Sequence, residues 1–530
     1  MYFFLIRIVM YGFIETTKET IDYNRIEKGE CLELLEPLFI DRKSTITDEN
    51  VYRELEVFED HSGDTSNSVF HKINMTQTYF GEMFLKNKLL NPVVSYNREP
   101  IKDMVGVPEF LSYIREKQKC LISFLKSVNP IYDSIFIHRN ILDILKQKDI
   151  QDSTQYIYNC FNLFLPMYNI LSLPIVLVLM AILRKFLPGY VIDKFRYFVN
   201  ISFMGLMNLN IFRIESVLGL VKILLYIGFF IYNIYSSIKF SVLTYILTKK
   251  ISEKLDIVRT IIKKTHDIFK RNSYGCKEIL FSDLPCKHSG EEMGVYSRLF
   301  RSDVIQSYIR FIGVVDYHYT RDILTRNGYT IPSYIKSKKP VIIVREMGNP
   351  ALDNSVRNNI SIHNNLIITG PNACGKSTFI KGVVLNLLMA QTIGLCCSDY
   401  MLFTPFSYIG TQLYSTDEKG KLSLFQKQIK RMDDYIEKIK TTNGFSFSAV
   451  DEMFNATNYK DSEKISDIYC DKLVGSKGIT IITTHLDNIT RRRPGITNYR
   501  MLVTKKQRGI DYTYKIEEGV NRESVLSYLI

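Results

Sequence analysis

The segment LIITGPNACGKSTFIKG, which begins at Leu366, has the residue types and spacing of a phosphate-binding loop. A short run of apolar and β-branched residues ends at Gly370, and a second glycine, Gly375, is followed directly by Lys376 and Ser377. Glycine permits backbone conformations that other side chains forbid, and the free N–H groups of a helix N-terminus bind phosphate oxygens. The spacing therefore predicts a strand, a P-loop and a helix that together bind a nucleoside triphosphate.

Each residue type in this loop has an expected role. Lys376 is predicted to reach the β- and γ-phosphates, and the Ser377 hydroxyl is predicted to bind Mg²⁺. The following helix is expected from Thr378 to Met389. The predicted nucleotide-binding residues are Gly370, Pro371, Asn372, Ala373, Cys374, Gly375, Lys376, Ser377 and Thr378.

Two carboxylates follow a second apolar run. Residues 445–450 are predicted to form a buried strand that ends at Asp451 and Glu452. Asp451 is expected to hold Mg²⁺, directly or through water, and Glu452 is expected to position or deprotonate the attacking water. The next apolar run, GITIITTH, ends at His485, which is predicted to sense the γ-phosphate. Lys376, Glu452 and His485 are thus the candidate catalytic residues, with ATP and Mg²⁺ as cofactors.

The elements that must position these residues belong to an α/β domain. After about Lys338, short β-rich runs alternate with helical patterns, which predicts a largely parallel sheet. The patterns from Met75 to about Leu145 and from Ile251 to Phe269 are mostly helical. The expected architecture is therefore a C-terminal α/β domain preceded by a mostly helical region.

The middle of the chain is strongly apolar. Residues 153–183 contain no charged residue, and their core, 161–183, is long enough to cross a bilayer. A second apolar run, 217–238, is interrupted only by Lys222 and some polar residues. Three interpretations remain open for this region: a two-helix membrane hairpin, a buried helical subdomain, and a surface for a partner.

Composition limits the classes of protein to consider. The chain has 530 residues, which predicts two to four domains, and its 46% apolar and 23% charged residues are typical of folded proteins. The net charge of +13 permits nucleic acid or an anionic membrane surface as a partner, with lysine-rich solubility as the alternative. The nine cysteines show no CxxC spacing, so no zinc site is predicted and the thiols are expected to be reduced.

The segments TGPNACGKST, DEMFNATN and TTH together resemble the MutS family of DNA mismatch-repair ATPases. The resemblance implies an α/β P-loop ATPase domain of the ABC type. The segment GKLSLFQKQIKRM resembles the family's signature, with Ser423 and Phe425 at the Ser-x-Phe positions. In such ATPases this serine caps the γ-phosphate in the opposite subunit, which implies a nucleotide-dependent homodimer. Gln428 stands where the family has an acidic residue, and the family's adenine-stacking aromatic residue is replaced near Ile360.

The resemblance extends upstream. NMTQTYFGEMFLKNKLLNPV resembles the start of the family's core or lever domain, and SYIRFIGVVDYHYTRDIL, around Asp316, resembles the lever helix that returns to the ATPase. Phe80 and Glu82 imitate the family's mismatch-reading Phe-x-Glu pair, but their context matches the lever start. The resemblance implies a short MutS-like form that lacks the mismatch-reading and connector domains. The expected domains are an unassigned N-terminal segment (1–40), the start of the lever (41–150), a hydrophobic helical segment (151–250), returning lever helices (251–338) and the ATPase domain (339–530).

Two functions compete. The first is an ATP-dependent, DNA-binding protein of the MutS family that acts in mismatch repair or recombination as an ATP-driven dimer clamp. It would bind mainly the phosphate backbone of DNA. The candidate cationic contacts, for which a solvated basic edge is the alternative interpretation, are Arg491, Arg492, Arg493, Lys505, Lys506 and Arg508.

The second function is a MutS-like ATPase tethered to a membrane through residues 153–247, with a scaffolding or mechanical role and no direct mismatch recognition. An ABC transporter subunit fits less well, because the TGPN motif and the lever resemblance do not belong to that class. Both remaining interpretations predict an intracellular protein, cytoplasmic or nuclear.

Overall fold

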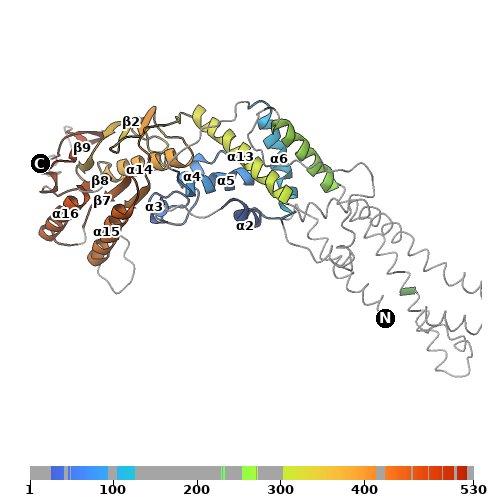
Figure 1. Cartoon of the computed structure of the whole chain (residues 1–530), viewed down its shortest axis with the longest axis horizontal. Helices are drawn as coiled ribbons and strands as arrows, with labels where there is room; N and C mark the ends of the chain where they lie inside the picture. The colour runs from blue at the N-terminus through green and yellow to red at the C-terminus, as the bar shows by residue number, and fades with distance from the viewer. Residues whose placement is uncertain are drawn as a thin grey trace, which may run out of the picture. The chain divides into compact units, whose positions relative to one another are not determined.

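Figure 1 shows the computed structural model of the chain, with the described helices and strands coloured along the sequence. The chain divides into two compact units, and each is built from two separate segments. One unit joins residues 1–34 to residues 113–309, and the other joins residues 35–112 to residues 310–530. The structure describes residues 26–40, 46–47, 49–93, 104–125, 228, 231–232, 235, 253–269, 271, 303–413, 424–454, 457–474, 477–486, 488–491, 493–505 and 510–521.

Helices dominate the described residues before the first strand. Residues 253–269 are helical, as the apolar periodicity predicted for 251–269. The helical character predicted from Met75 onward is confirmed where the structure describes that region. The helices with defined bounds are α2 (Lys28–Phe39), α3 (Glu49–Glu54), α4 (Val69–Ile73), α5 (Tyr79–Leu90), α6 (Val107–Ile122) and α13 (Asp303–Arg326).

A buried carboxylate on α13 fixes the start of α5. Asp316 is 0% exposed and accepts hydrogen bonds from the backbone N–H of Gln77 at 3.0 Å and of Thr78 at 2.8 Å, and from the Thr78 hydroxyl at 2.7 Å. Thr78 Oγ1 in turn accepts from Gly81 N at 3.1 Å and caps α5. A Cβ atom at Gly81 would lie 2.2 Å from Asp316 Oδ2, so only glycine fits there. Phe80, one half of the imitated mismatch reader, is 0% exposed and is a core residue.

Strands and helices alternate in the C-terminal part, as the sequence predicted. The predicted loop is followed by a helix that begins at Lys376, slightly earlier than expected. The elements, in chain order, are β1 (Ser333–Tyr334), β2 (Ile342–Met347), β3 (Asn358–Ile362), β4 (Asn365–Thr369), α14 (Lys376–Thr392), β5 (Tyr400–Phe403), β6 (Tyr408–Gln412), α15 (Leu424–Thr441), β7 (Ser446–Asp451), α16 (Tyr459–Val474), β8 (Gly478–Thr484), the 3₁₀ helix η3 (Asn488–Thr490), β9 (Ile496–Lys505) and β10 (Ile510–Glu518).

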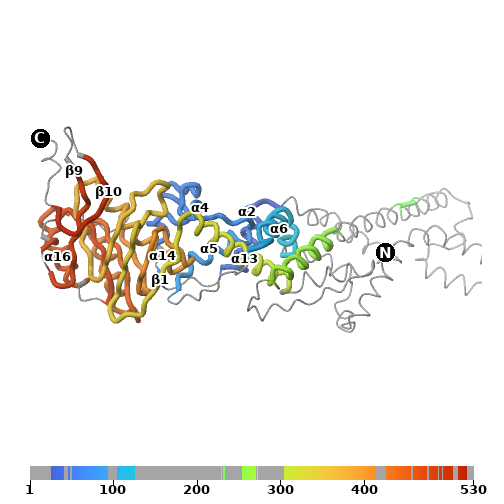
Figure 2. The backbone as a smooth tube through the Cα atoms, turned by 90° about the horizontal axis from the view of Figure 1, so that it is seen from above, coloured from blue at the N-terminus to red at the C-terminus, as the bar shows by residue number. Residues whose placement is uncertain are grey.

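The larger sheet is mostly parallel. Its strand order is β10-β9-β4-β8-β7-β6, and every neighbouring pair is parallel except β9 and β10. Figure 2 shows β9 and β10 side by side at the C-terminal end of the described chain. The parallel arrangement places the carboxyl ends of β4, β7 and β8 at the same edge of the sheet.

A second sheet, with strand order β1-β5-β2-β3, was not predicted from the sequence. Its pairings are mixed: β1 and β5 are parallel, whereas β2 is antiparallel to both β3 and β5. The strong apolar run of β2 was recognised as a strand. Its partner β3, by contrast, alternates buried and exposed positions, and β1 has only two residues, both exposed.

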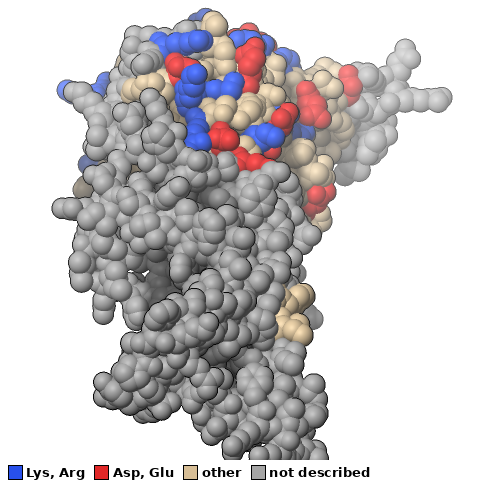
Figure 3. Space-filling view, turned by 90° about the vertical axis from the view of Figure 1, so that its right-hand side faces the viewer, with Lys and Arg blue, Asp and Glu red and all other residues tan. Residues whose placement is uncertain are grey.

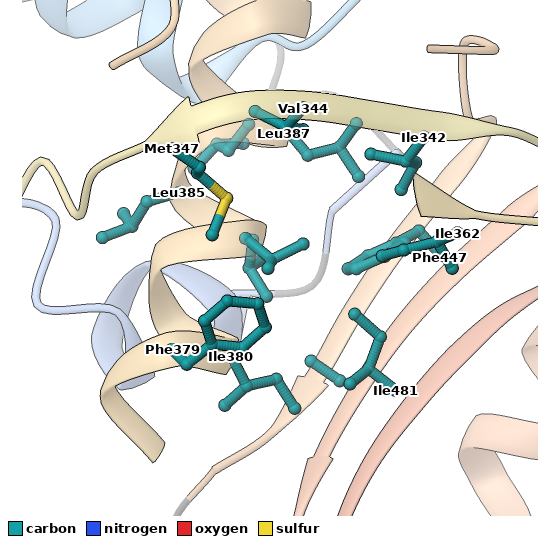
Figure 4. Packing of buried hydrophobic residues seen from close by; sticks show 14 of the residues in the cluster. Ile342, Val344, Met347, Ile362, Phe379, Ile380, Leu385, Leu387, Phe447 and Ile481 are labelled. Carbon is teal, nitrogen blue, oxygen red and sulfur yellow. The ribbon is translucent and has the colours of Figure 1, made fainter. Parts of the chain in front are cut away.

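Helix α14 packs between the two sheets. Its Phe379, Ile380 and Leu387 lie in one hydrophobic cluster with Val344 of the smaller sheet and Phe447 of the larger sheet (Figure 4). Most side chains of α14 are buried, in agreement with its lack of a polar face. Burial of a side chain of this size contributes roughly 1.5–3 kcal/mol. The core therefore holds the helix that follows the glycine-rich loop rigidly against both sheets.

The other face of the larger sheet is covered by α15 and α16. Ile367 of β4 and Ile482 of β8 lie in a second cluster with Met432 and Ile436 of α15 and Leu473 of α16. Successive side chains of a strand point to opposite faces, so a central strand covered on both sides is apolar throughout. This explains why β4 and β8 read as continuous apolar runs in the sequence.

None of the helices that the structure describes combines the length and the apolar character needed to cross a membrane. The apolar segment 151–250 lies outside the described residues except at positions 228, 231, 232 and 235. The proposed membrane hairpin therefore stays a prediction.

Candidate functional site

The glycine-rich loop connects the buried strand β4 to α14. All five residues of β4 are buried, and the loop that follows has a left-handed backbone at Ala373 (φ 65°) and Gly375 (φ 95°). Gly375 is the residue that precedes α14, and a Cβ atom there would lie 2.9 Å from Cδ1 of Tyr514. Both the backbone angle and the close approach of this ring therefore require glycine at this position.

The loop residues divide into buried and exposed positions. Asn372, Ala373, Ser377 and Thr378 are exposed, whereas Pro371, Cys374 and Lys376 are buried and Gly375 is partly buried. The Cys374 side chain packs against Gly370, and burial raises the pKa of its thiol. The exposed positions leave the start of α14 accessible to a ligand, and the buried side chains pack against the rest of the domain and hold the loop in place.

Lys376 is 5% exposed and is held by its own loop. Its Nζ donates to the carbonyl oxygens of Gly370 at 3.0 Å and Pro371 at 3.2 Å, and it lies 3.1 Å from His485 Nε2. Burial lowers the pKa of Lys376, and neighbouring groups that include Glu452 oppose this shift. The ammonium group is thus held by the loop carbonyl oxygens, within hydrogen-bond distance of His485.

The two predicted carboxylates lie where β7 ends. Asp451 is the last residue of β7 and pairs in register with Thr483 of β8. Glu452 follows with φ 48°, a left-handed conformation that costs a residue with a side chain about 1–3 kcal/mol. Its Oε1 lies 2.8 Å from His485 Nε2. The structure thus brings Lys376, Glu452 and His485 together, because the neighbouring strands β4, β7 and β8 end at the same edge.

Histidine Nε2 is within hydrogen-bond distance of both Lys376 Nζ and Glu452 Oε1. Without a proton this nitrogen accepts from the lysine, and with a proton it donates to the carboxylate. Since one atom cannot do both, His485 has two alternative hydrogen-bonded arrangements at this site.

The residues present fit a divalent cation of the magnesium type. Such a cation prefers oxygen ligands and usually takes only one or two from protein. The exposed Ser377 offers a hydroxyl at the start of α14. Asp451 Oδ1 accepts from the Thr483 hydroxyl, and no hydrogen bond to Oδ2 occurs among the described residues. Among those residues no group of three or more His, Cys, Asp or Glu side chains could hold a metal ion.

Of the two residues at the Ser-x-Phe positions of the predicted signature, only Phe425 lies among the described residues. Ser423 lies outside the described residues. Phe425 is in α15, partly buried, with its ring 6.2 Å from that of Phe454. Ile360 is 3% exposed in the core of the smaller sheet and offers no surface to a base.

Sequence reasoning missed Tyr514. This residue lies in β10, has φ 55°, and is 45% exposed, with its ring against Gly375. Asn358 fixes the strand on both sides: it donates to Tyr514 O and accepts from Ile516 N, each at 3.0 Å. The only signal in the sequence is the alternation of tyrosines in IDYTYKI, which also describes an ordinary strand.

The order of elements and the contents of the loop define a C-terminal α/β domain of the ATPase type. Residues 366–527 match the family model described as MutS domain V. The chain is 31% identical over 170 residues to MutS protein homolog 4 of Homo sapiens, which covers 30% of this chain and 18% of that protein. It is 25% identical over 287 residues to the DNA mismatch repair protein MutS of Halothermothrix orenii, which covers 52% of this chain and 30% of that protein.

A third relative, the DNA mismatch repair protein MutS of Thermotoga maritima, is 27% identical over 211 residues, which cover 38% of this chain and 25% of the relative. The matched part therefore spans less than a third of each of these relatives. Within that part the similarities support membership of the MutS family, and the recognition of this family from the motifs is confirmed.

Proposed function

We propose that the chain is an ATP-dependent DNA-binding protein of the MutS family and that its C-terminal P-loop domain, of the ABC type, hydrolyses ATP. The observation that carries this proposal is the cluster of Lys376, His485 and Glu452 beside the glycine-rich loop. It lies within the range that matches MutS domain V. A strand-end acid, a histidine and a buried lysine around one loop are the groups that triphosphate hydrolysis needs.

In the proposed mechanism the exposed N-terminus of α14 and Lys376 bind the phosphates, because both present positive charge to them. Bound Mg²⁺ supplies charge that offsets the phosphate oxygens, with Ser377 and Asp451 as its protein ligands. Glu452 orients and deprotonates the attacking water. His485 donates to the γ-phosphate instead of to Glu452, which leaves the Glu452 carboxylate available to the water.

Tyr514 is the proposed platform for the nucleobase. Its exposed ring lies against Gly375 at the edge of the phosphate loop, and aromatic faces stack on bases of any sequence. This assignment supplies the aromatic contact that the sequence analysis did not find near Ile360.

The proposed partner is DNA, because the relatives include proteins named for DNA mismatch repair. Arg493, one of the candidate contacts, is paired with Asp467 and Asp471 of α16, so its charge is largely offset within the domain. Lysine, arginine and acidic side chains are intermixed on the described part of the face in Figure 3. DNA binding is therefore proposed to involve phosphate contacts distributed over the surface.

The proposed assembly is a nucleotide-dependent dimer, in which Ser423 of the second subunit completes the nucleotide-binding site.

The second candidate is the membrane-tethered ATPase. The observation that favours it is the segment 153–183, which contains no charged residue. A cell fractionation separates the two candidates: retention in the membrane pellet after an alkaline wash supports the tether, whereas elution with DNA supports the first function.

The ATPase proposal is tested with two variants. Lys376→Ala is expected to abolish ATP binding, because the phosphates lose their buried cation. Glu452→Ala is expected to bind ATP normally but to hydrolyse it about 100-fold or more slowly, within the range attributed to general base catalysis. Filter binding and phosphate release measure the two effects. Wild-type turnover in the Glu452 variant would remove this residue from the catalytic role.

A further inference from the structure

The buried hydroxyl of Thr483 contacts the Asp451 carboxylate and the backbone N–H of Glu452. Thr483 lies in β8, two residues before His485, and is 0% exposed. Its Oγ1 donates a hydrogen bond to Asp451 Oδ1 and accepts one from the backbone N–H of Glu452 at 3.1 Å. The parallel register of β7 and β8, which sets Asp451 opposite Thr483, makes this arrangement possible.

The direction of these hydrogen bonds is fixed by chemistry. The N–H of Glu452 can only donate, and an ionised carboxylate can only accept, so the single proton of the Thr483 hydroxyl is directed at Asp451. This bond occupies Oδ1 and restrains the rotation of the carboxylate, and no hydrogen bond to Oδ2 occurs among the described residues.

The same hydroxyl supports the backbone at Glu452. Glu452 has φ 48°, in the left-handed region, and its N–H donates to both the carbonyl oxygen of Thr483 at 3.2 Å and its Oγ1 at 3.1 Å. Residues in this region persist where the surrounding structure holds them. The conformation of Glu452 determines where its carboxylate points, so a contact that holds the backbone also places the proposed general base.

We propose that Thr483 is a positioning residue, whose buried hydroxyl orients Asp451 toward Mg²⁺ and holds the backbone of Glu452 in its left-handed conformation. The inference rests on the proposed ATPase site and adds to it a residue that contacts neither nucleotide nor metal. Partners that orient metal ligands typically change metal affinity or activity by about 10–100-fold when removed.

Three variants test the role. Thr483→Val removes the hydroxyl with little change in shape, Thr483→Ala removes it without any risk of overpacking, and Thr483→Ser keeps it. The matched control is Thr411→Val in β6, which is also buried and whose Oγ1 has no hydrogen-bond partner within the part of the chain that the structure describes. The primary measurement is a Mg²⁺ titration of the binding of a fluorescent ATP analogue, with thermal unfolding and phosphate release recorded alongside.

The Mg²⁺ concentration for half-maximal binding is expected to rise about tenfold or more in Thr483→Val and Thr483→Ala. It is expected to remain near the wild-type value in Thr483→Ser and in the Thr411 control. A lower unfolding temperature without a change in Mg²⁺ dependence would overturn the inference, because that is what a purely structural hydroxyl would produce. If the wild-type chain binds no nucleotide at any Mg²⁺ concentration, the proposed function itself fails. If the wild type binds nucleotide and Thr483→Ala needs the same Mg²⁺ concentration for half-maximal binding, only the role of Thr483 is overturned.

Discussion

At the residue scale, the proposed ATPase site depends on backbone conformations that few residue types adopt, because these conformations set the positions of its side chains. Gly375 and Glu452 both have positive φ, at 95° and 48°. Glycine adopts such angles without strain, whereas glutamate does so at a cost. Strain at Glu452, offset by its two hydrogen bonds to Thr483, is what a preorganised general base would require.

Tyr514 gives a prediction at the same scale. Tyr514→Ala is expected to weaken ATP binding by about 1–3 kcal/mol, the range measured when stacking on a base is removed. Tripolyphosphate, which has no base, is expected to bind the variant as it binds the wild type. Competition of each ligand against a fluorescent ATP analogue measures both affinities.

The control for this prediction is Tyr512→Ala. Its ring lies 6.4 Å from that of Tyr514 in the same strand, but it is Tyr514 that contacts the phosphate loop. An equal loss of ATP and tripolyphosphate affinity in Tyr514→Ala would show that the ring supports the loop and does not contact the base.

At the element scale, α5 and α13 are joined by Asp316, which accepts hydrogen bonds from three N–H or O–H groups of Gln77 and Thr78, the two residues that precede α5. Asp316→Asn keeps the size of the side chain but places an NH₂ group among donors. Loss of a hydrogen bond to a charged group costs about 1.5–3 kcal/mol. The free energy of unfolding of the variant is therefore expected to fall by at least this amount, and its unfolding temperature to fall with it.

Differential scanning calorimetry measures this effect. The matched control is Asp353→Asn, which removes a carboxylate that is 85% exposed and paired with Lys72. An exposed pair of this kind contributes about 0–1 kcal/mol, so the control is expected to unfold near the wild-type temperature. Equal stability of both variants would show that Asp316 does not join the two helices.

The strands of the site could be predicted from the sequence because each is a short apolar run that ends at a functional residue. β4, β7 and β8 are buried on both faces and lead directly to Gly370, Asp451–Glu452 and His485. The smaller sheet could not be predicted, because β3 alternates, β1 is exposed, and its pairings join distant segments. Tyr514 was missed for a related reason: only the return of β10 beside β9 brings its ring to Gly375.

At the scale of the whole molecule, DNA binding is expected to depend on phosphate contacts. Phe80, the aromatic residue of the Phe-x-Glu sequence that resembles a mismatch reader, is 0% exposed in the core and so cannot stack on a base. Among the candidate cations, Arg493 is already paired with two aspartates. No described side chain is therefore identified as a reader of a mispaired base, and the proposed DNA binding is expected to rest on the phosphate backbone.

The corresponding prediction is a steep dependence of DNA affinity on salt with little dependence on sequence. Each phosphate contact contributes about 0.9 to the slope of log affinity against log salt, because binding releases condensed counterions. Fluorescence anisotropy on matched, G·T-mismatched and four-way-junction DNA measures the slope and the preference. The preference for the mismatch is expected to be less than about tenfold. A tenfold preference corresponds to about 1.4 kcal/mol, which is in the lower part of the range for one specific base contact, about 1–3 kcal/mol. The junction is the substrate on which shape alone can raise the affinity. A larger mismatch preference would require a reading element outside the described residues, whereas absence of binding to all three DNAs at low salt would favour the membrane-tethered ATPase.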